Sequence, residues 1–187
     1  MALSEEIENS SYYQSRGPIC SEPIAEVSKI SPGPMPSHRV LIVDDHESFR
    51  GFVCSMLQER PGLQIIAEAS DGLEAVRKAD ELQPDLILLD IGLPTLDGID
   101  AAQRISRVAP NAKVIFITQH NDTEIARAVL SNGASGYVLK MDTRSELSPA
   151  MDVVLRGGKF LSSRVSRTAS LGIGSDHNQT VSLGTLR

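Results

Sequence analysis

The most constraining feature of the sequence is a short apolar run that ends in a single carboxylate. Leu86–Leu89 are all apolar, Asp90 follows them directly, and the turn-forming residues Gly92 and Pro94 come next. A run without polar alternation is typical of a central strand in a parallel sheet that helices cover on both faces. Because ligands bind outside the carboxyl ends of such strands, Asp90 is expected at a functional edge of the sheet.

Strand-like and helix-like patterns alternate five times in about 120 residues. Apolar runs predict strands at about 39–43, 63–69, 86–90, 113–118 and 136–139, and amphipathic spacing predicts helices at about 46–60, 72–82, 98–108, 123–130 and 144–155. Parallel neighbours require helical crossovers, and these crossovers cover both faces of the sheet. We therefore predict a doubly wound α/β domain of three layers, (βα)5, with a central five-stranded parallel sheet.

The last predicted helix contains one misfit, Pro149, which lacks a backbone donor and clashes with the preceding turn. Either the helix is kinked at Pro149, or a separate helix begins there with Ser148 as its cap. Thr143 and Glu146 have the spacing of a capping box, which favours the earlier start and the kink.

The composition describes one compact domain with flanking tails. The chain has 187 residues, 41% of them hydrophobic, and a formal net charge of −6, which argues weakly against nucleic acid as the main partner. Residues 1–37 hold five of the ten prolines and are expected to be a disordered arm, 38–161 the domain, and 162–187 a flexible tail. No apolar stretch reaches the roughly 18 residues that span a bilayer, so a cytoplasmic location is expected.

Polar and charged residues follow several of the predicted strands. Asp44 and Asp45 follow the first, Asp90 the third and Lys140 the fifth, while Thr118 ends the fourth. Each has an ordinary structural explanation by itself, such as a helix cap, a β-branched strand residue or a solvated end. Because these strand ends converge on one edge of a parallel sheet, we expect three carboxylates, a hydroxyl and an ammonium around a common pocket.

This arrangement resembles the receiver domain of two-component response regulators, a flavodoxin-like domain, over about Arg39–Leu161. The residues that carry the resemblance are the pair Asp44-Asp45, Asp90 in the motif D-I-G-L-P-x-x-D-G, Thr118, Tyr137 and Lys140. The stretches Gly133–Lys140 and Gly157–Leu161 look like the subgroup whose receivers usually precede a LuxR/NarL-type helix-turn-helix domain.

The resemblance implies that Asp90 is the phosphoacceptor and that the site binds Mg²⁺. Asp45 and Asp90 would ligate the metal directly, Asp44 partly through water, and Gly92 through its backbone carbonyl. Like charges held this closely are costly, and a divalent cation that prefers oxygen ligands offsets the repulsion.

The resemblance also implies a switch rather than an enzyme, a phosphoacceptor that assists its own phosphorylation and dephosphorylation. Lys140 would supply positive charge, Thr118 would turn inward to donate to a phosphoryl oxygen, and Tyr137 would follow it. His120, two residues after Thr118, lies where family members tune the loss of the phosphoryl group; a plain solvated loop histidine is the alternative.

The implied donor is a sensor histidine kinase or a phosphotransfer protein, whereas the downstream partner is not indicated and a phosphorylation-dependent homodimer is left open. Only 26 residues follow Leu161, fewer than the roughly 60 of a helix-turn-helix domain, so DNA binding by this chain alone is not expected. Contact with a membrane is not expected either, because the chain has no long apolar stretch. The alternative is the receiver part of a truncated LuxR/NarL-type transcription regulator. A phosphatase of the haloacid-dehalogenase kind is disfavoured, because Gly92 stands where those enzymes carry a second Asp.

Overall fold

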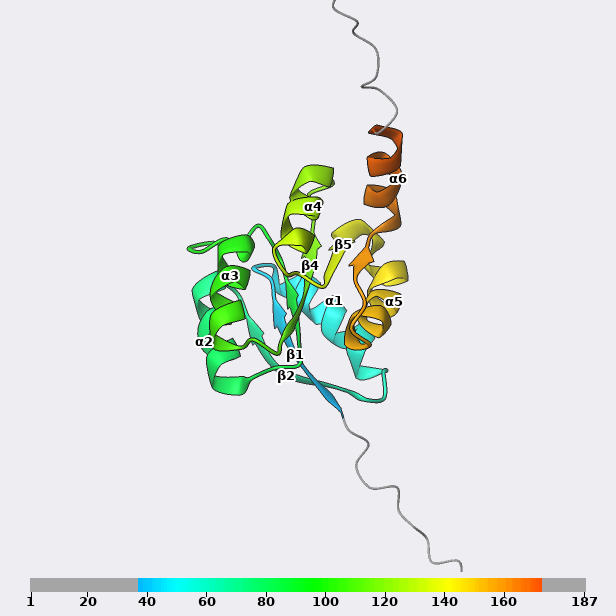
Figure 1. Ribbon diagram of the computed structural model, residues 1–187. Helices are drawn as coiled ribbons and strands as arrows, with labels where there is room; N and C mark the ends of the chain where they lie inside the picture. Colours follow the sequence, from blue (N-terminus) through cyan, green and yellow to red (C-terminus); the bar gives the residue numbers. More distant parts are fainter. Residues whose placement is uncertain (1–36, 173–187) are drawn as a thin grey trace, which may run out of the picture. The chain divides into compact units, whose positions relative to one another are not determined.

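The structure is a computed structural model and describes residues 37–172, so the predicted N-terminal arm lies almost wholly outside the described residues. The strands are β1 (His38–Val43), β2 (Leu63–Ala69), β3 (Leu86–Leu89), β4 (Lys113–Thr118), β5 (Gly136–Leu139) and β6 (Phe160–Leu161). The helices are α1 (Glu47–Gln58), α2 (Gly72–Leu82), α3 (Gly98–Val108), α4 (Thr123–Ser131), α5 (Thr143–Leu155) and α6 (Ser163–Gly172), with a 3-10 turn η1 (Lys140–Asp142). The strands form one parallel sheet in the order β2-β1-β3-β4-β5-β6 (Figure 1).

The four residues of β3 show how an apolar run becomes the centre of a three-layer domain. Ile87 and Leu89 face a cluster that includes residues of α2, α3 and α4, whereas Leu86 and Leu88 face a second cluster built with α1 and α5. All four side chains are at most 1% exposed. Burying one such side chain contributes about 1.5–3 kcal/mol, which explains why both faces of this strand are apolar.

Aspartates at the starts of three helices fix where the loops end. Asp71, Asp97 and Asp122 are the N-caps of α2, α3 and α4, and each carboxylate accepts from two backbone N–H groups of the first helical turn. Such a cap satisfies donors that have no partner within the helix. The loops at the carboxyl ends of β2, β3 and β4 are therefore tied to defined helix starts.

The predicted five strands and five helices are all present, but the C-terminal boundary was wrong. A two-residue strand, β6, joins the edge of the sheet beside β5, and α6 follows it in part of the region expected to be a flexible tail. The segment is rich in Ser and Arg and carries few large apolar residues, yet it folds because Val165 is fully buried and polar side chains of α5 and η1 hold its first turn. Residues 173–187 lie outside the described part of the chain.

The start of α5 also differs from the expected capping box. Asp142 is the N-cap residue and Thr143 lies inside the helix, where its hydroxyl donates to the carbonyl of Leu139 at 3.3 Å. The carboxylate of Glu146 accepts from Ser163 instead. Pro149 lies inside one continuous helix, as the earlier start required.

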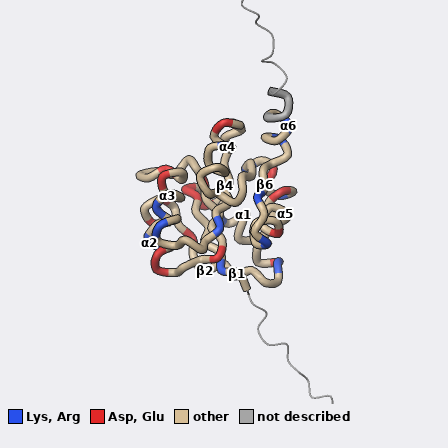
Figure 2. The backbone as a smooth tube through the Cα atoms, in the orientation of Figure 1, with Lys and Arg blue, Asp and Glu red and all other residues tan. Residues whose placement is uncertain are grey.

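Charged residues of both signs are spread over the helices, whereas β3 and β5 contain none (Figure 2). In the described residues, every helix is too short or too polar to cross a bilayer. The charges that do lie inside the domain are confined to the loops after the strands.

The start of α3 lies directly under the residue that follows β3. The N–H of Gly98 donates to the carbonyl of Ile91 at 2.9 Å, and a Cβ at Gly98 would lie 1.9 Å from the carbonyl oxygen of Asp90. No side chain fits there, because the obstacle is backbone rather than a flexible side chain. Gly98 therefore lets α3 approach closely enough to support the backbone of Asp90.

We predict that Gly98→Ala destabilises the domain by about 3 kcal/mol, because the added methyl forces the α3 start and Asp90 apart. Gly51→Ala is the matched control: Gly51 is exposed in α1 with open space where an added methyl would lie, so the change should be neutral or stabilise by about 0.5–1 kcal/mol. Urea unfolding of both variants measures the difference. Equal midpoints for Gly98→Ala and the unsubstituted protein would contradict the close approach.

Candidate functional site

Two of the three predicted acidic residues, Asp44 and Asp90, meet at the carboxyl ends of β1 and β3. These strands are neighbours with Val43 opposite Leu89, so the residues that follow them, Asp44 and Asp90, lie side by side. The N–H of Asp90 donates to the carbonyl of Val43 at 2.9 Å and fixes this register. Asp44 is 2% exposed and Asp90 is 5% exposed, and such buried carboxylates need a charged partner.

Lys140 is that partner. It follows β5 directly, and its ammonium nitrogen lies 2.6 Å from Oδ2 of Asp44 and 2.6 Å from Oδ2 of Asp90. Burial opposes the charged form of Lys140, but hydrogen bonds and charge from Asp44 and Asp90 outweigh it, so the pKa of the ammonium is raised. The ring of Phe49 lies under the ammonium, with 4.9 Å from nitrogen to ring centroid, and adds a cation–π contact.

The third carboxylate, Asp45, is more open to solvent than Asp44. Its Oδ1 lies 2.6 Å from Nδ1 of His46, and that nitrogen is also 3.5 Å from Oδ1 of Asp44. Potential ligand atoms of these three residues lie within 4.8 Å of one another. Hard divalent cations take carboxylate oxygens and keep several waters, so this partly open donor set fits such an ion.

Gly92 lies beside Asp90 through its backbone. Its N–H donates to Oδ1 of Asp90 at 3.2 Å, and the residue is exposed. Together with Lys140 on Oδ2, this bond holds both carboxylate oxygens of Asp90 in place.

Thr118 and Tyr137 are joined by the backbone of one residue, His120. The Thr118 hydroxyl accepts from the N–H of His120 at 3.2 Å, and the Tyr137 hydroxyl donates to the carbonyl of His120 at 2.7 Å. Both side chains are fully buried, and burial, with a smaller effect of the Asp122 charge, raises the pKa of Tyr137 to about 12. In this structure Tyr137 thus lies buried inside the domain, while the Thr118 hydroxyl stays bonded to the backbone of His120.

An open hollow of about 510 Å³ shares Lys140 and His46 with the acidic cluster. Its lining residues come from α1 and from the loops after β4 and β5: His46, Ser48, Phe49, Thr118, Gln119, Leu139, Lys140 and Met141. His46 and Phe49 were not predicted as parts of the site. Their signal was their position directly after Asp44-Asp45: His46 is the N-cap of α1 and Phe49 lies in its first turn.

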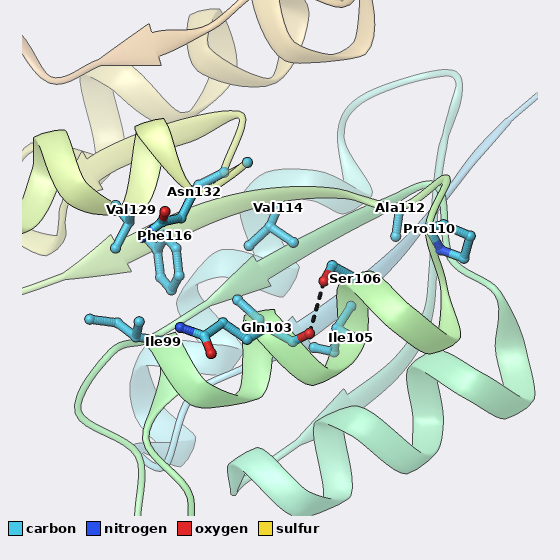
Figure 3. Close-up of a pocket in the computed structure, with 13 residues that line it drawn as sticks. Ile99, Gln103, Ile105, Ser106, Pro110, Ala112, Val114, Phe116, Val129 and Asn132 are labelled. Atoms are coloured by element: carbon cyan, nitrogen blue, oxygen red, sulfur yellow. Dashed lines mark hydrogen bonds between the residues drawn. The ribbon is translucent and has the colours of Figure 1, made fainter.

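A second hollow, of about 110 Å³, lies between α3 and α4 (Figure 3). Phe116, Ile105 and Val129 line it, with polar atoms from Gln103, Ser106 and Asn132, and Ser106 donates to the carbonyl of Gln103 at 2.8 Å. Its lining contains no ionisable side chain, so it offers no acid–base or metal chemistry.

Comparisons with known proteins agree with this geometry. The family model of the response regulator receiver domain matches residues 40–152. The chain is 38% identical over 128 residues to the transcriptional regulatory protein LiaR of Bacillus subtilis, covering 68% of this chain and 61% of LiaR. It is 33% identical over 133 residues to the response regulator GacA of Pseudomonas viridiflava, covering 71% of this chain and 62% of GacA. The chain thus spans about three-fifths of the length of these relatives.

Solved structures give the same result. A LuxR-family two-component response regulator from Aurantimonas sp. SI85-9A1 is similar with a TM-score of 0.70 at 31% identity, covering 73% of this chain and 98% of that one. The isolated receiver domain of RcsB from Salmonella enterica serovar Typhimurium, with the phosphomimetic BeF3⁻, gives a TM-score of 0.66 at 27% identity, covering 70% and 97%. The fold, the acidic edge and these comparisons together show that this chain belongs to the response regulator receiver domain family of two-component systems.

Proposed function

We propose that Asp90 is the phosphoacceptor of this chain and takes its phosphoryl group from the phosphohistidine of a sensor histidine kinase or a phosphotransfer protein. The observation that carries the proposal is Lys140, whose ammonium lies 2.6 Å from both Asp44 and Asp90. A cation placed there neutralises charge on an incoming phosphoryl group as well as on the two carboxylates. The chain is in this sense a substrate that assists its own phosphorylation and dephosphorylation.

The acidic cluster supports Mg²⁺ as the resident cation. Asp45 and Asp90 would hold it directly, Asp44 partly through water, and Gly92 through its carbonyl. When bound, the ion offsets repulsion among the carboxylates and the negative charge on the phosphoryl oxygens. The chain itself contributes the nucleophile, held at both oxygens by Gly92 and Lys140, in a largely water-shielded position.

The output is a change of conformation. A phosphoryl group on Asp90 adds about −1.5 to −2 charges and three acceptor oxygens, so it favours the conformer in which the Thr118 hydroxyl turns toward it. Thr118 would then release the N–H of His120, whose carbonyl holds Tyr137. The face formed by α4, β5 and α5 would change its affinity for a protein partner or for a second copy of the chain.

Control of transcription through DNA is the second candidate function, because LiaR is named a transcriptional regulatory protein and a solved structure of the neighbour RcsB is titled as a complex with DNA. Lys and Arg are interspersed with Asp and Glu over the described elements rather than gathered on one face (Figure 2). DNA affinity depends on basic residues that neutralise phosphates, so the charges of this chain favour protein partners.

We expect Asp90→Asn to abolish incorporation of labelled phosphate from a small phosphodonor, because an amide oxygen is not a competent nucleophile here. Chelating Mg²⁺ should abolish labelling of the unsubstituted chain as well. Asp100→Asn, at an exposed carboxylate in the first turn of α3, is the matched control and should label normally. Hydroxylamine should release the label, since the bond is an acyl phosphate. Equal labelling of Asp90→Asn and the control would refute the assignment.

Substitutions at Asp45 and at Thr118 should distinguish metal binding from the conformational switch. Asp45→Ala should weaken Mg²⁺ binding by about 10–100-fold, because a ligand is lost. Thr118→Ala should leave Mg²⁺ affinity unchanged and slow labelling by at most about tenfold, while the conformational response to phosphorylation is lost. Mn²⁺ titration followed by EPR measures the metal site, and amide NMR shifts with and without phosphodonor measure the response. Loss of metal binding in Thr118→Ala would show that the two roles are not separate.

We expect the full chain to show no DNA binding that rises as salt is lowered from about 200 to 50 mM, because its formal net charge is −6. Fluorescence anisotropy with a labelled duplex, before and after phosphorylation, is the measurement. Binding that strengthens steeply at low salt would favour the transcription-regulator alternative.

A further inference from the structure

The first turn of α6 is held by polar contacts to η1 and α5. The guanidinium of Arg164 donates from two nitrogens to the two carboxylate oxygens of Asp142, at 3.1 Å each. The hydroxyl and the N–H of Ser163 both donate to Oε1 of Glu146, at 2.5 and 3.1 Å. These paired contacts hold the first turn of α6 in one defined position beside α5.

The same turn also contributes to the buried cluster that contains Tyr137. Val165 is 0% exposed and belongs to that cluster, and Leu161 packs against it. The N–H of Ser162 donates to the carbonyl of Tyr137 at 2.8 Å, and Leu161 is paired with Tyr137 across β5 and β6. α6 also lies beside α4 (Figure 1), which contributes Ala126 and Val129 to the same cluster.

From these contacts we infer that α6 is a clamp that keeps Tyr137 in its buried position. Tyr137 turns outward only when the contacts of α6 with η1 and α5 are broken. The steric reason is that Tyr137 is 0% exposed within a cluster to which α6 contributes Val165, so an outward rotamer needs space that this cluster occupies while α6 is docked. The inference deepens the proposed function and rests on it where phosphorylation is concerned.

Two connections lead from α6 to the acidic site. One is covalent: Asp142, which binds Arg164, is the last residue of the 3-10 turn that begins with Lys140. The other is a pair of hydrogen bonds, from Tyr137 to the carbonyl of His120 and from the N–H of His120 to Thr118. The position of α6 therefore depends on the two elements that lead to the acidic site, the 3-10 turn η1 and the hydrogen bonds from Tyr137 through His120 to Thr118.

Because α6 and the acidic site share these elements, docking of α6 and phosphorylation of Asp90 affect each other reciprocally. Docked α6 favours buried Tyr137, and the proposed inward movement of Thr118 favours the same position. Two events that stabilise one conformer raise each other's probability by the same factor. Docking of α6 should thus promote phosphoryl uptake, and phosphorylation should tighten the docking of α6.

The clamp is weak enough to open. Arg164 is 44% exposed, so its ion pair with Asp142 is screened by salt. Among the described residues, the Ser162 hydroxyl and Oε2 of Glu146 are buried without a hydrogen-bond partner, and both would regain water when α6 leaves. Val165 is the fully buried side chain among those of α6 that are described.

Arg164→Asp in the full chain tests the clamp, because it puts a like charge against Asp142. Arg104→Asp makes the same charge change at an exposed position of α3 whose charge does not act on Asp142, and is the control. Labelling with 3-fluorotyrosine and ¹⁹F NMR reports on Tyr137, whose resonance is assigned by its loss in Tyr137→Phe. We expect Arg164→Asp to shift the Tyr137 resonance toward that of exposed tyrosine, Arg104→Asp to leave it unchanged, and the swap Arg164→Asp with Asp142→Arg to restore it.

The second readout is phosphoryl uptake from a small phosphodonor, which we expect to fall about fivefold in Arg164→Asp and to recover in the swap. An unchanged Tyr137 resonance in Arg164→Asp overturns the clamp, whatever Asp90 does. A released Tyr137 with unchanged uptake overturns the coupling. Absence of labelling in the unsubstituted chain would instead reject the proposed function, while the NMR comparison still decides the clamp.

Discussion

The ammonium of Lys140, placed between two nearly buried carboxylates, is the interaction on which the rest of the site depends. Asp44 and Asp90 are 2% and 5% exposed, and two like charges so close together would repel each other at a high cost in folding free energy without a cation between them. Each of the three residues comes from a different strand end. The cluster is therefore formed only when β1, β3 and β5 lie in one parallel sheet with their carboxyl ends on the same edge.

The loops that carry these charges are held in place by backbone and aromatic contacts. Gly98 allows α3 to start against the backbone of Asp90, and the N–H of Gly92 fixes one carboxylate oxygen. Phe49 places an aromatic face under Lys140. Fixed positions matter because electrostatic stabilisation costs least when the groups need no rearrangement during the reaction. The site thus combines a rigidly held carboxylate, that of Asp90, with an open side at Asp45.

The structure also shows how a charge change at Asp90 can reach a surface without a long path. One backbone unit, that of His120, contacts both Thr118 and Tyr137, and one 3-10 turn separates Lys140 from Asp142. Both connections end at β6 and the first turn of α6. Under the proposed function, a small movement at the site would therefore change the contacts at the sheet edge beside β6.

The sequence by itself determined the order of strands and helices and the residue types at the strand ends. The reason is local: β3 needs apolar residues on both faces, and Asp71, Asp97 and Asp122 mark helix starts by capping. Sequence did not reveal α6, because its short run of mostly small and polar residues is typical of a flexible tail and its position depends on Asp142 and Glu146, which lie 22 and 17 residues before their partners. The capping box failed for the same reason, since Glu146 finds a better-placed donor in Ser163. Only the tertiary structure decided the position of α6, the partner of Glu146 and the buried position of Tyr137. All three depend on which distant groups the fold brings within hydrogen-bonding distance.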